Sequence, residues 1–264
     1  MKEKNKDKSK KNKRKHSKKI LRVLVYIVLI AFVLSFVFLI GFGIYHLCTS
    51  SKYVVKKVEF KGNVIYDIET LTATANVPMG ENLYRFSKKT IKNNLDTLSY
   101  IDKIKINRKL PDTVQITLKE YVSKYMAYNI EEDIYIRLSE DGVILERVEG
   151  EQKQETELLL FGISFDDNAK EKSIIAETEI KKIEKYEIVK KVYEKSSIEK
   201  EITSVEFKEN NVILTLDYDI NVILNMDNLD YNISFLASIL ERISGKAGTI
   251  DMTKTNPVFT ESIR

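Results

Sequence analysis

The sequence has few of the residues that form covalent cross-links or catalytic centres. Its 264 residues include 1 Cys, 2 His and no Trp, with only 3 Pro and 9 Gly. The lone cysteine, Cys48, excludes an intramolecular disulfide and a cysteine-based metal cluster. Hydrophobic residues make up 43% of the chain, which excludes wholesale disorder. Folded parts must therefore be held together by packing.

The scarcity of histidine also narrows the chemistry. His16 and His46 are the two histidines, and no cysteine follows Cys48. The region after Cys48 therefore cannot form a Ser-His-Asp or Cys-His catalytic site or a His-zinc site. This also excludes a sortase-like transpeptidase. The common Gly-rich phosphate-binding runs are absent as well. Paired carboxylates could still serve a hydrolase of cell-wall sugars. The sequence has no Trp on which sugar rings could stack, so we expect a non-enzymatic protein that binds no cofactor and no metal.

Positive charge is concentrated at the N-terminus. Residues 1–22 hold 12 Lys or Arg and two acidic residues, whereas the rest of the chain holds 31 basic and 37 acidic residues. The first 22 residues lack apolar periodicity, so we expect a disordered, cytoplasmic basic tail that contacts anionic lipid. It has no aromatic residue to stack on bases, and the remainder is mildly acidic. We therefore expect no nucleic-acid partner.

An uncharged apolar run follows this tail. No Asp, Glu, Lys or Arg lies between Val23 and Ser51. At about 1.5 Å per residue, its most apolar 25 residues reach roughly 37 Å, more than the roughly 30 Å hydrocarbon core of a bilayer. We predict one transmembrane helix over 23–47 with its N-terminus in the cytoplasm. A cleaved signal peptide is the alternative, but its apolar region is typically shorter and ends in small residues.

Two mixed domains are predicted after the helix. Over 53–121 the patterns run in the order β-α-α-β-β, with Asp67 and Ser87 as helix starts and a turn at Pro111. Over 122–260 alternating strand patterns predominate, with helix patterns over 173–195 and from about Asp230 to Ile243. Residues 261–264 form a short C-terminal end. The predicted fold class is α+β: a disordered basic tail, one transmembrane helix, the β-α-α-β-β module and a larger β-rich domain with flanking helices.

The order of tail, helix and module resembles the FtsQ/DivIB family of bacterial division proteins. The module opens with VEFKGN and closes with RKLPDTVQITLKE, and it resembles a POTRA domain. Residues 109–112 (KLPD) and Glu120 stand where the family has its turn motif and the end of the following strand. Tyr121 and Val122 depart from the Arg and Pro that often follow. The final GTIDMTKTNPVF is similar to the family's terminal strand.

The resemblance implies a non-enzymatic protein of the cell membrane, with its C-terminal domains outside, that scaffolds or stabilises the divisome at the septum. Implied partners are FtsL-type and FtsB/DivIC-type division proteins and a septal transpeptidase. Family contacts cluster on the last strand and the preceding helix, which here implies partner-binding residues Ile250, Met252, Val258, Phe259 and Tyr231.

Two alternatives stay open. Ile250 and Met252 fit ordinary core positions equally well, whereas a charged residue in place of Phe259 is expected to weaken binding without unfolding. The alternative to a division protein is an envelope-assembly or secretion-associated POTRA protein with a chaperone-like binding role. Such proteins tend to carry the module in tandem repeats, and here it occurs once.

Overall fold

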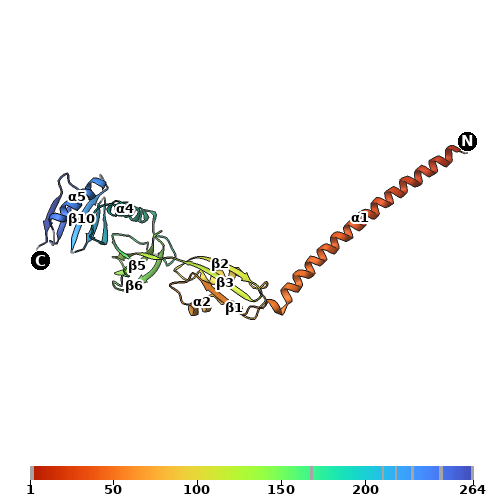
Figure 1. The fold of residues 1–264 in the computed structure, drawn as a ribbon, viewed down its shortest axis with the longest axis horizontal. Helices are drawn as coiled ribbons and strands as arrows, with labels where there is room; N and C mark the ends of the chain where they lie inside the picture. Colours follow the sequence, from red (N-terminus) through yellow and green to blue (C-terminus); the bar gives the residue numbers. More distant parts are fainter. Residues whose placement is uncertain are drawn as a thin grey trace. The chain divides into compact units, whose positions relative to one another are not determined.

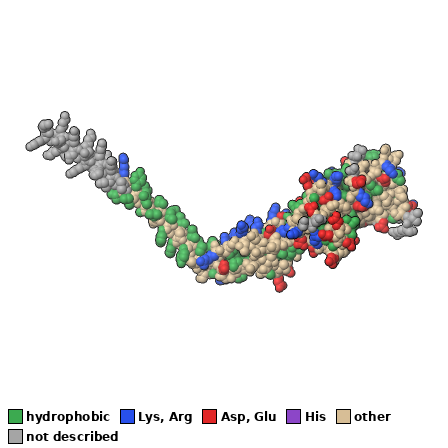
Figure 2. All heavy atoms as spheres, turned by 180° about the vertical axis from the view of Figure 1, so that it is seen from behind, with side chains coloured by type: hydrophobic (Ala, Val, Ile, Leu, Met, Phe, Trp, Pro, Cys, Tyr) green, Lys and Arg blue, Asp and Glu red, His purple; other side chains and the backbone are tan. Residues whose placement is uncertain are grey.

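The computed structural model describes residues 3–166, 169–209, 211–217, 219–226, 229–243 and 246–262, with side chains described at Arg22 and from Leu24 onward. Its first element is the long helix α1 (Glu3–Thr49). Residues Leu24–Thr49 of α1, which include an 18-residue stretch with a mean hydropathy of 3.0, are long and apolar enough to cross a membrane. Their apolar side chains are exposed along the helix (Figure 2).

Helix α1 is longer than the predicted helix over 23–47, and it extends into the basic tail. The structure is helical from Glu3 onward, so α1 includes most of the tail. Lys and Arg are good helix formers, and residues 1–22 contain neither Pro nor Gly. Because the apolar segment already supplies a helical nucleus, each further residue adds a hydrogen bond without a new nucleation cost.

The β-α-α-β-β order of the module is confirmed (Figure 1). Its elements are β1 (Lys57–Lys61), α2 (Ile68–Ala75), α3 (Lys88–Leu95), β2 (Ile101–Lys109) and β3 (Thr113–Glu120), preceded by the 3-10 turn η1 (Ser51–Tyr53). The strands form a sheet in the order β1-β3-β2, with β1 parallel to β3. Ser87 caps α3, because its hydroxyl accepts a hydrogen bond from the Thr90 N–H at 3.3 Å.

A nine-stranded sheet forms most of the remainder. Its strands are β4 (Ser123–Asn129), β5 (Ile134–Ser139), β6 (Ile144–Val148), β7 (Leu158–Phe161), β8 (Ile202–Lys208), β9 (Asn211–Leu216), β10 (Ile220–Asn225), β11 (Gly248–Asp251) and β12 (Val258–Glu261). Their order in the sheet is β12-β11-β10-β9-β8-β7-β4-β5-β6. The predicted β-rich domain with flanking helices is therefore present.

Two helices supply the crossovers that parallel strands need. Helix α4 (Glu177–Tyr193) joins β7 to the parallel β8, and α5 (Leu229–Arg242) joins β10 to the parallel β11. Buried side chains of both helices share one hydrophobic core with the strands. Because that core lies on one face of the sheet, buried and half-buried residues alternate along strands such as β9 and β10.

The described chain packs as two units that interleave along the sequence. One contains residues 1–61, 68–94 and 105–117, and the other contains residues 62–67, 95–104 and 118–264. Both β2 and β3 therefore contribute residues to each unit. The predicted boundary between 53–121 and 122–260 stays a prediction.

The C-terminal segment differs from the single strand that we expected over 248–259. It forms two antiparallel strands, β11 and β12, separated by a turn. Polar residues with high turn preference, 253–256 (TKTN), lie between the apolar ends.

Candidate functional site

The C-terminal strand β12 lies at one edge of the nine-stranded sheet. It pairs antiparallel with β11, so that Ile250 is opposite Phe259 and Asp251 is opposite Val258. Within the described residues no strand pairs with its other side. An unpaired edge of this kind can accept a strand from another chain.

The register shows which peptide groups face this free edge. The N–H groups of Gly248 and Met252 donate to carbonyls of Asp219 and Ile223, at 3.2 and 2.9 Å, on the β10 side. Peptide groups alternate in direction along a strand, so Thr249 and Asp251 face β12. Their partners Thr260 and Val258 face back toward β11. The intervening peptide groups of Phe259 and Glu261 therefore point away from the sheet.

Asp251 organises the turn between β11 and β12. Its Oδ1 accepts hydrogen bonds from the Thr253 hydroxyl at 2.6 Å and the Thr253 N–H at 3.0 Å. Its Oδ2 lies 3.3 Å from the Lys254 ammonium. The hydrogen bond from the Thr253 hydroxyl, helped by the Thr253 N–H and Lys254, holds the pKa of Asp251 below its usual value. A charged Asp251 therefore fixes the start of the loop that leads to the edge strand.

The structure separates the five predicted partner-binding residues. Ile250 and Met252 are at most 2% exposed and belong to the core, whereas Tyr231 is 66% and Val258 46% exposed. Phe259 is half-buried and packs against the core. Their role in binding stays a prediction, but only Tyr231 and Val258 offer a largely free side chain while the sheet is intact.

Phe259 packs against Gly248 on the neighbouring strand β11. A Cβ at Gly248 would lie 2.3 Å from the Thr260 carbonyl oxygen and 2.8 Å from the Phe259 ring. Only a residue without a side chain lets β12 approach this closely. A charged residue in place of Phe259 would therefore enter a core contact, so Val258 is the better position for a binding test.

A second aromatic residue accompanies Tyr231 on α5. The Tyr231 and Phe235 rings are stacked, with centroids 6.2 Å apart and an angle of 5° between their planes. Phe235 is itself 37% exposed. The i, i+4 spacing of two aromatic residues on a predicted helix could have identified this pair from the sequence.

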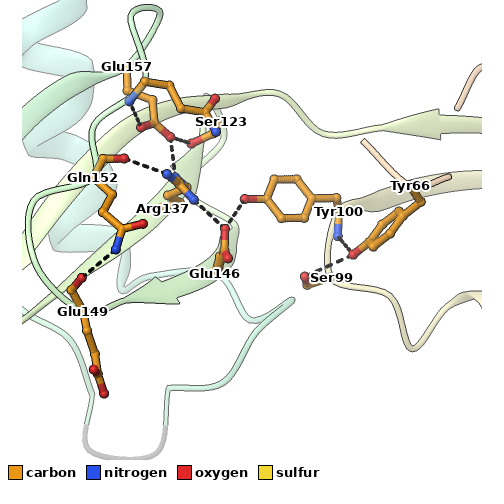
Figure 3. Close-up of polar contacts among 10 residues, drawn as sticks. Tyr66, Ser99, Tyr100, Ser123, Arg137, Glu146, Glu149, Gln152 and Glu157 are labelled. Carbon is orange, nitrogen blue, oxygen red and sulfur yellow. Dashed lines mark hydrogen bonds and ion pairs between the residues drawn. The ribbon is translucent and has the colours of Figure 1, made fainter. Parts of the chain in front are cut away.

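A buried polar network lies elsewhere in the same packing unit (Figure 3). The Arg137 guanidinium donates to Glu157 at 2.9 Å and to Glu146 at 2.7 Å. Glu146 also accepts the Tyr100 hydroxyl hydrogen at 2.9 Å, and Glu157 accepts that of Ser123. Burial, together with the bond to Glu146, raises the pKa of the Tyr100 hydroxyl, which therefore stays protonated and donating.

Glu120, the last residue of β3, organises the loop after β1. One of its carboxylate oxygens accepts the N–H groups of Val64 and Ile65, both at 2.7 Å. The other accepts the Tyr66 N–H at 3.4 Å. Because it accepts three consecutive backbone N–H groups, the Glu120 carboxylate stabilises the conformation of this loop.

The comparisons with known proteins agree with this architecture. Residues 54–121 match the family described as "POTRA domain, FtsQ-type". "Cell division protein DivIB" of Clostridium botulinum (strain Hall) is 31% identical over 116 residues, which are 44% of this chain and 44% of the relative. The match thus spans less than half of that relative's length.

Longer alignments exist at lower identity. "Cell division protein DivIB" of Clostridium tetani is 27% identical over 213 residues, which cover 78% of this chain and 68% of the relative. The protein of the same name from Clostridium acetobutylicum is 22% identical over 232 residues, covering 81% and 86%. With a match to the FtsQ-type POTRA domain over residues 54–121, this chain is similar to cell division proteins of the FtsQ/DivIB family.

Proposed function

We propose that the protein is a membrane-anchored, non-enzymatic division protein that holds other membrane-anchored division proteins at the septum. Its expected partners are of the FtsL and FtsB/DivIC types, together with a septal transpeptidase. Helix α1 crosses the cell membrane with its basic end in the cytoplasm. The rest of the chain then faces outward, where the partners' own outer segments can reach it.

The observation that carries this proposal is the free edge of β12. Phe259 and Glu261 direct peptide groups outward, so a partner segment can add to the sheet as a further strand. Val258 is exposed beside them and offers a side chain for selectivity. Recognition of this kind needs no catalytic residue and no cofactor.

The test is the position in growing cells of the full chain with a fluorescent protein fused to its N-terminus. Glu261→Pro removes an outward N–H, while the inward-facing groups of β12 remain; edge strands tolerate proline. Glu261→Ala is the matched control, because both variants lose the 2.8 Å ion pair with Lys246. Both purified variants should unfold at the same temperature.

We expect a midcell band for the unsubstituted chain and for Glu261→Ala, and a weaker band for Glu261→Pro. A uniform membrane signal for the unsubstituted chain in dividing cells would refute the division role and favour the envelope-assembly alternative. A band of full intensity for Glu261→Pro would refute strand addition at β12.

A further inference from the structure

A pocket of about 770 Å³ opens at the loop after β1, and all of its lining residues belong to the second packing unit. Its wall includes the rings of Tyr66 and Tyr100, which meet edge to face with centroids 6.2 Å apart. A volume of this size is in the range of specific binding pockets. Since β12 contributes nothing to the lining, this pocket is separate from the edge strand.

The pocket is held open by the polar contacts already described. Glu120 fixes the backbone of the loop that carries Val64 and Ile65. Tyr100 is fixed at both ends, because its N–H donates to the Tyr66 hydroxyl at 3.3 Å and its own hydroxyl donates to Glu146 (Figure 3). The walls are thus positioned before any ligand binds, which reduces the entropic cost of binding.

Exposed aliphatic side chains surround the mouth. Val64 is 89%, Val122 72% and Ile65 47% exposed, and all three line the pocket. The two most exposed contribute little to the core, so stability does not explain why they are apolar. Neighbouring exposed apolar side chains at a pocket are typical of a protein-binding surface.

The charge of the lining is negative. It contains the carboxylates of Glu120, Glu146 and Glu171 but only one cation, Lys119. Lys119 is already paired with Asp102 at 2.8 Å. Glu171 is exposed, and within the described residues the structure assigns it no ion pair or hydrogen bond. Tyr100 is buried in a small core cluster with Val143 and Leu145, whereas Tyr66 is half-buried. A ligand that brings a positive charge would therefore find an unpaired carboxylate and the accessible part of the Tyr66 ring.

We propose that this pocket binds a segment of another extracytoplasmic protein in which an arginine lies next to a large aliphatic residue. The guanidinium enters between the Tyr66 ring and Glu171, and the aliphatic side chain packs on Val64 and Val122. Arginine fits better than lysine, because its planar group stacks on aromatic rings and donates several hydrogen bonds to carboxylates. The proposal goes beyond strand addition at β12 and identifies a second binding surface.

The experiment uses the full chain in lipid nanodiscs and a fluorescein-labelled peptide, Gly-Leu-Arg-Leu-Gly, with binding followed by fluorescence anisotropy. Two matched peptides replace the Arg by Gln or both Leu by Ser. We expect each matched peptide to bind at least about fivefold more weakly, because each loses one class of contact. Equal binding of the three peptides, or no binding of the first at millimolar concentration, would overturn the proposal.

Protein variants locate the binding. Glu171→Lys and Val122→Ser should each lower the affinity for the Gly-Leu-Arg-Leu-Gly peptide by about five- to tenfold. Their matched controls, Glu184→Lys on α4 and Ile130→Ser, are exposed positions of the same unit and should change affinity by less than about twofold. An equal loss in variants and controls would place the peptide elsewhere and overturn the inference.

This test is independent of the division role. Glu261→Pro should bind the peptide normally, because β12 is not part of the pocket. Failure of peptide binding beside a normal midcell band would remove the pocket proposal alone. Normal peptide binding by a chain that does not gather at midcell would remove the division role alone.

Discussion

Arg137 is a buried charged side chain whose removal should strongly destabilise the second packing unit. Its side chain is 11% exposed and binds two carboxylates and the Gln152 carbonyl oxygen, at distances of 2.7 to 2.9 Å. The Glu157 side chain is 0% exposed. Arg137→Met keeps most of the volume but leaves the Glu157 carboxylate buried with the Ser123 hydroxyl and the Gln154 N–H as its remaining donors.

The magnitude follows from burial. Breaking a buried ion pair by removing one partner costs about 3–5 kcal/mol, because the remaining charge loses its compensation. An exposed pair such as Lys246 and Glu261, each more than 50% exposed, contributes about 0–1 kcal/mol. We therefore expect Arg137→Met to cost several times more than Lys246→Met. Adding Glu157→Gln removes the buried charge: the amide oxygen can accept the Gln154 N–H, and the amide NH2 can donate to the Ser123 hydroxyl oxygen. The double variant should therefore regain about 1–3 kcal/mol.

The free energy of unfolding can be measured for the full chain in detergent micelles by urea titration. Tyrosine fluorescence is a suitable signal, since the chain has 14 Tyr and no Trp. The urea dependence should have the same slope in all variants, so that the midpoints compare stability. A loss below about 1 kcal/mol for Arg137→Met, or a double variant less stable than the single one, would refute the assignment of a buried, mutually compensating pair.

Two further predictions concern the edge strand. Gly248→Ala should cost about 1–3 kcal/mol of stability and weaken partner binding, because its Cβ would lie 2.3 Å from the Thr260 carbonyl oxygen and push β12 outward; unchanged amide exchange of β12 would contradict this. Thr253→Val should raise the pKa of Asp251, since it removes the hydroxyl hydrogen bond that lowers it most. A lowered pKa stabilises the fold above the unfolded value of about 4 and loses this contribution as pH falls through the folded value. The stability deficit of Thr253→Val should therefore be present at pH 7 and shrink at pH 3, and a deficit independent of pH would contradict the reasoning.

Much of the fold was predictable because its signals are local. Alternation with a period of two residues identified the strands, and cap residues such as Ser87 identified helix starts. The length of α1 was not predicted, because composition alone does not account for a helix that propagates from an adjoining apolar segment. The pairing of Arg137 with Glu157 was not predictable either. Their partnership depends on a fold that removes both from water, and a charged residue in a strand ordinarily faces solvent.

The candidate site was predictable only to the level of the segment. Among the apolar residues Ile250, Met252, Val258 and Phe259, the sequence allowed core positions for Ile250 and Met252, but it did not indicate that Phe259 packs inward while Val258 is exposed. The separation comes from the register of β11 against β10 and β12, which places Ile250 inside and Val258 outside. The importance of Gly248 depends on the same register, because the close approach of Phe259 is a contact between strands.

The energetics of the free edge indicate what a partner must add. Phe259 and Glu261 present two outward N–H groups and two carbonyls, so a paired strand gains at most four hydrogen bonds. At about 0.5–1.5 kcal/mol net each, these supply roughly 2–6 kcal/mol. Association costs an estimated 4–15 kcal/mol in lost freedom, so strand pairing alone does not hold a complex together.

Edge pairing therefore sets alignment, and affinity has to come from buried side chains. Val258 on β12 and the stacked pair Tyr231 and Phe235 on α5 are exposed side chains that a partner could bury. If backbone pairing dominated instead, replacing all three by serine would leave partner affinity unchanged, whereas burial of these side chains requires a loss of at least about a hundredfold.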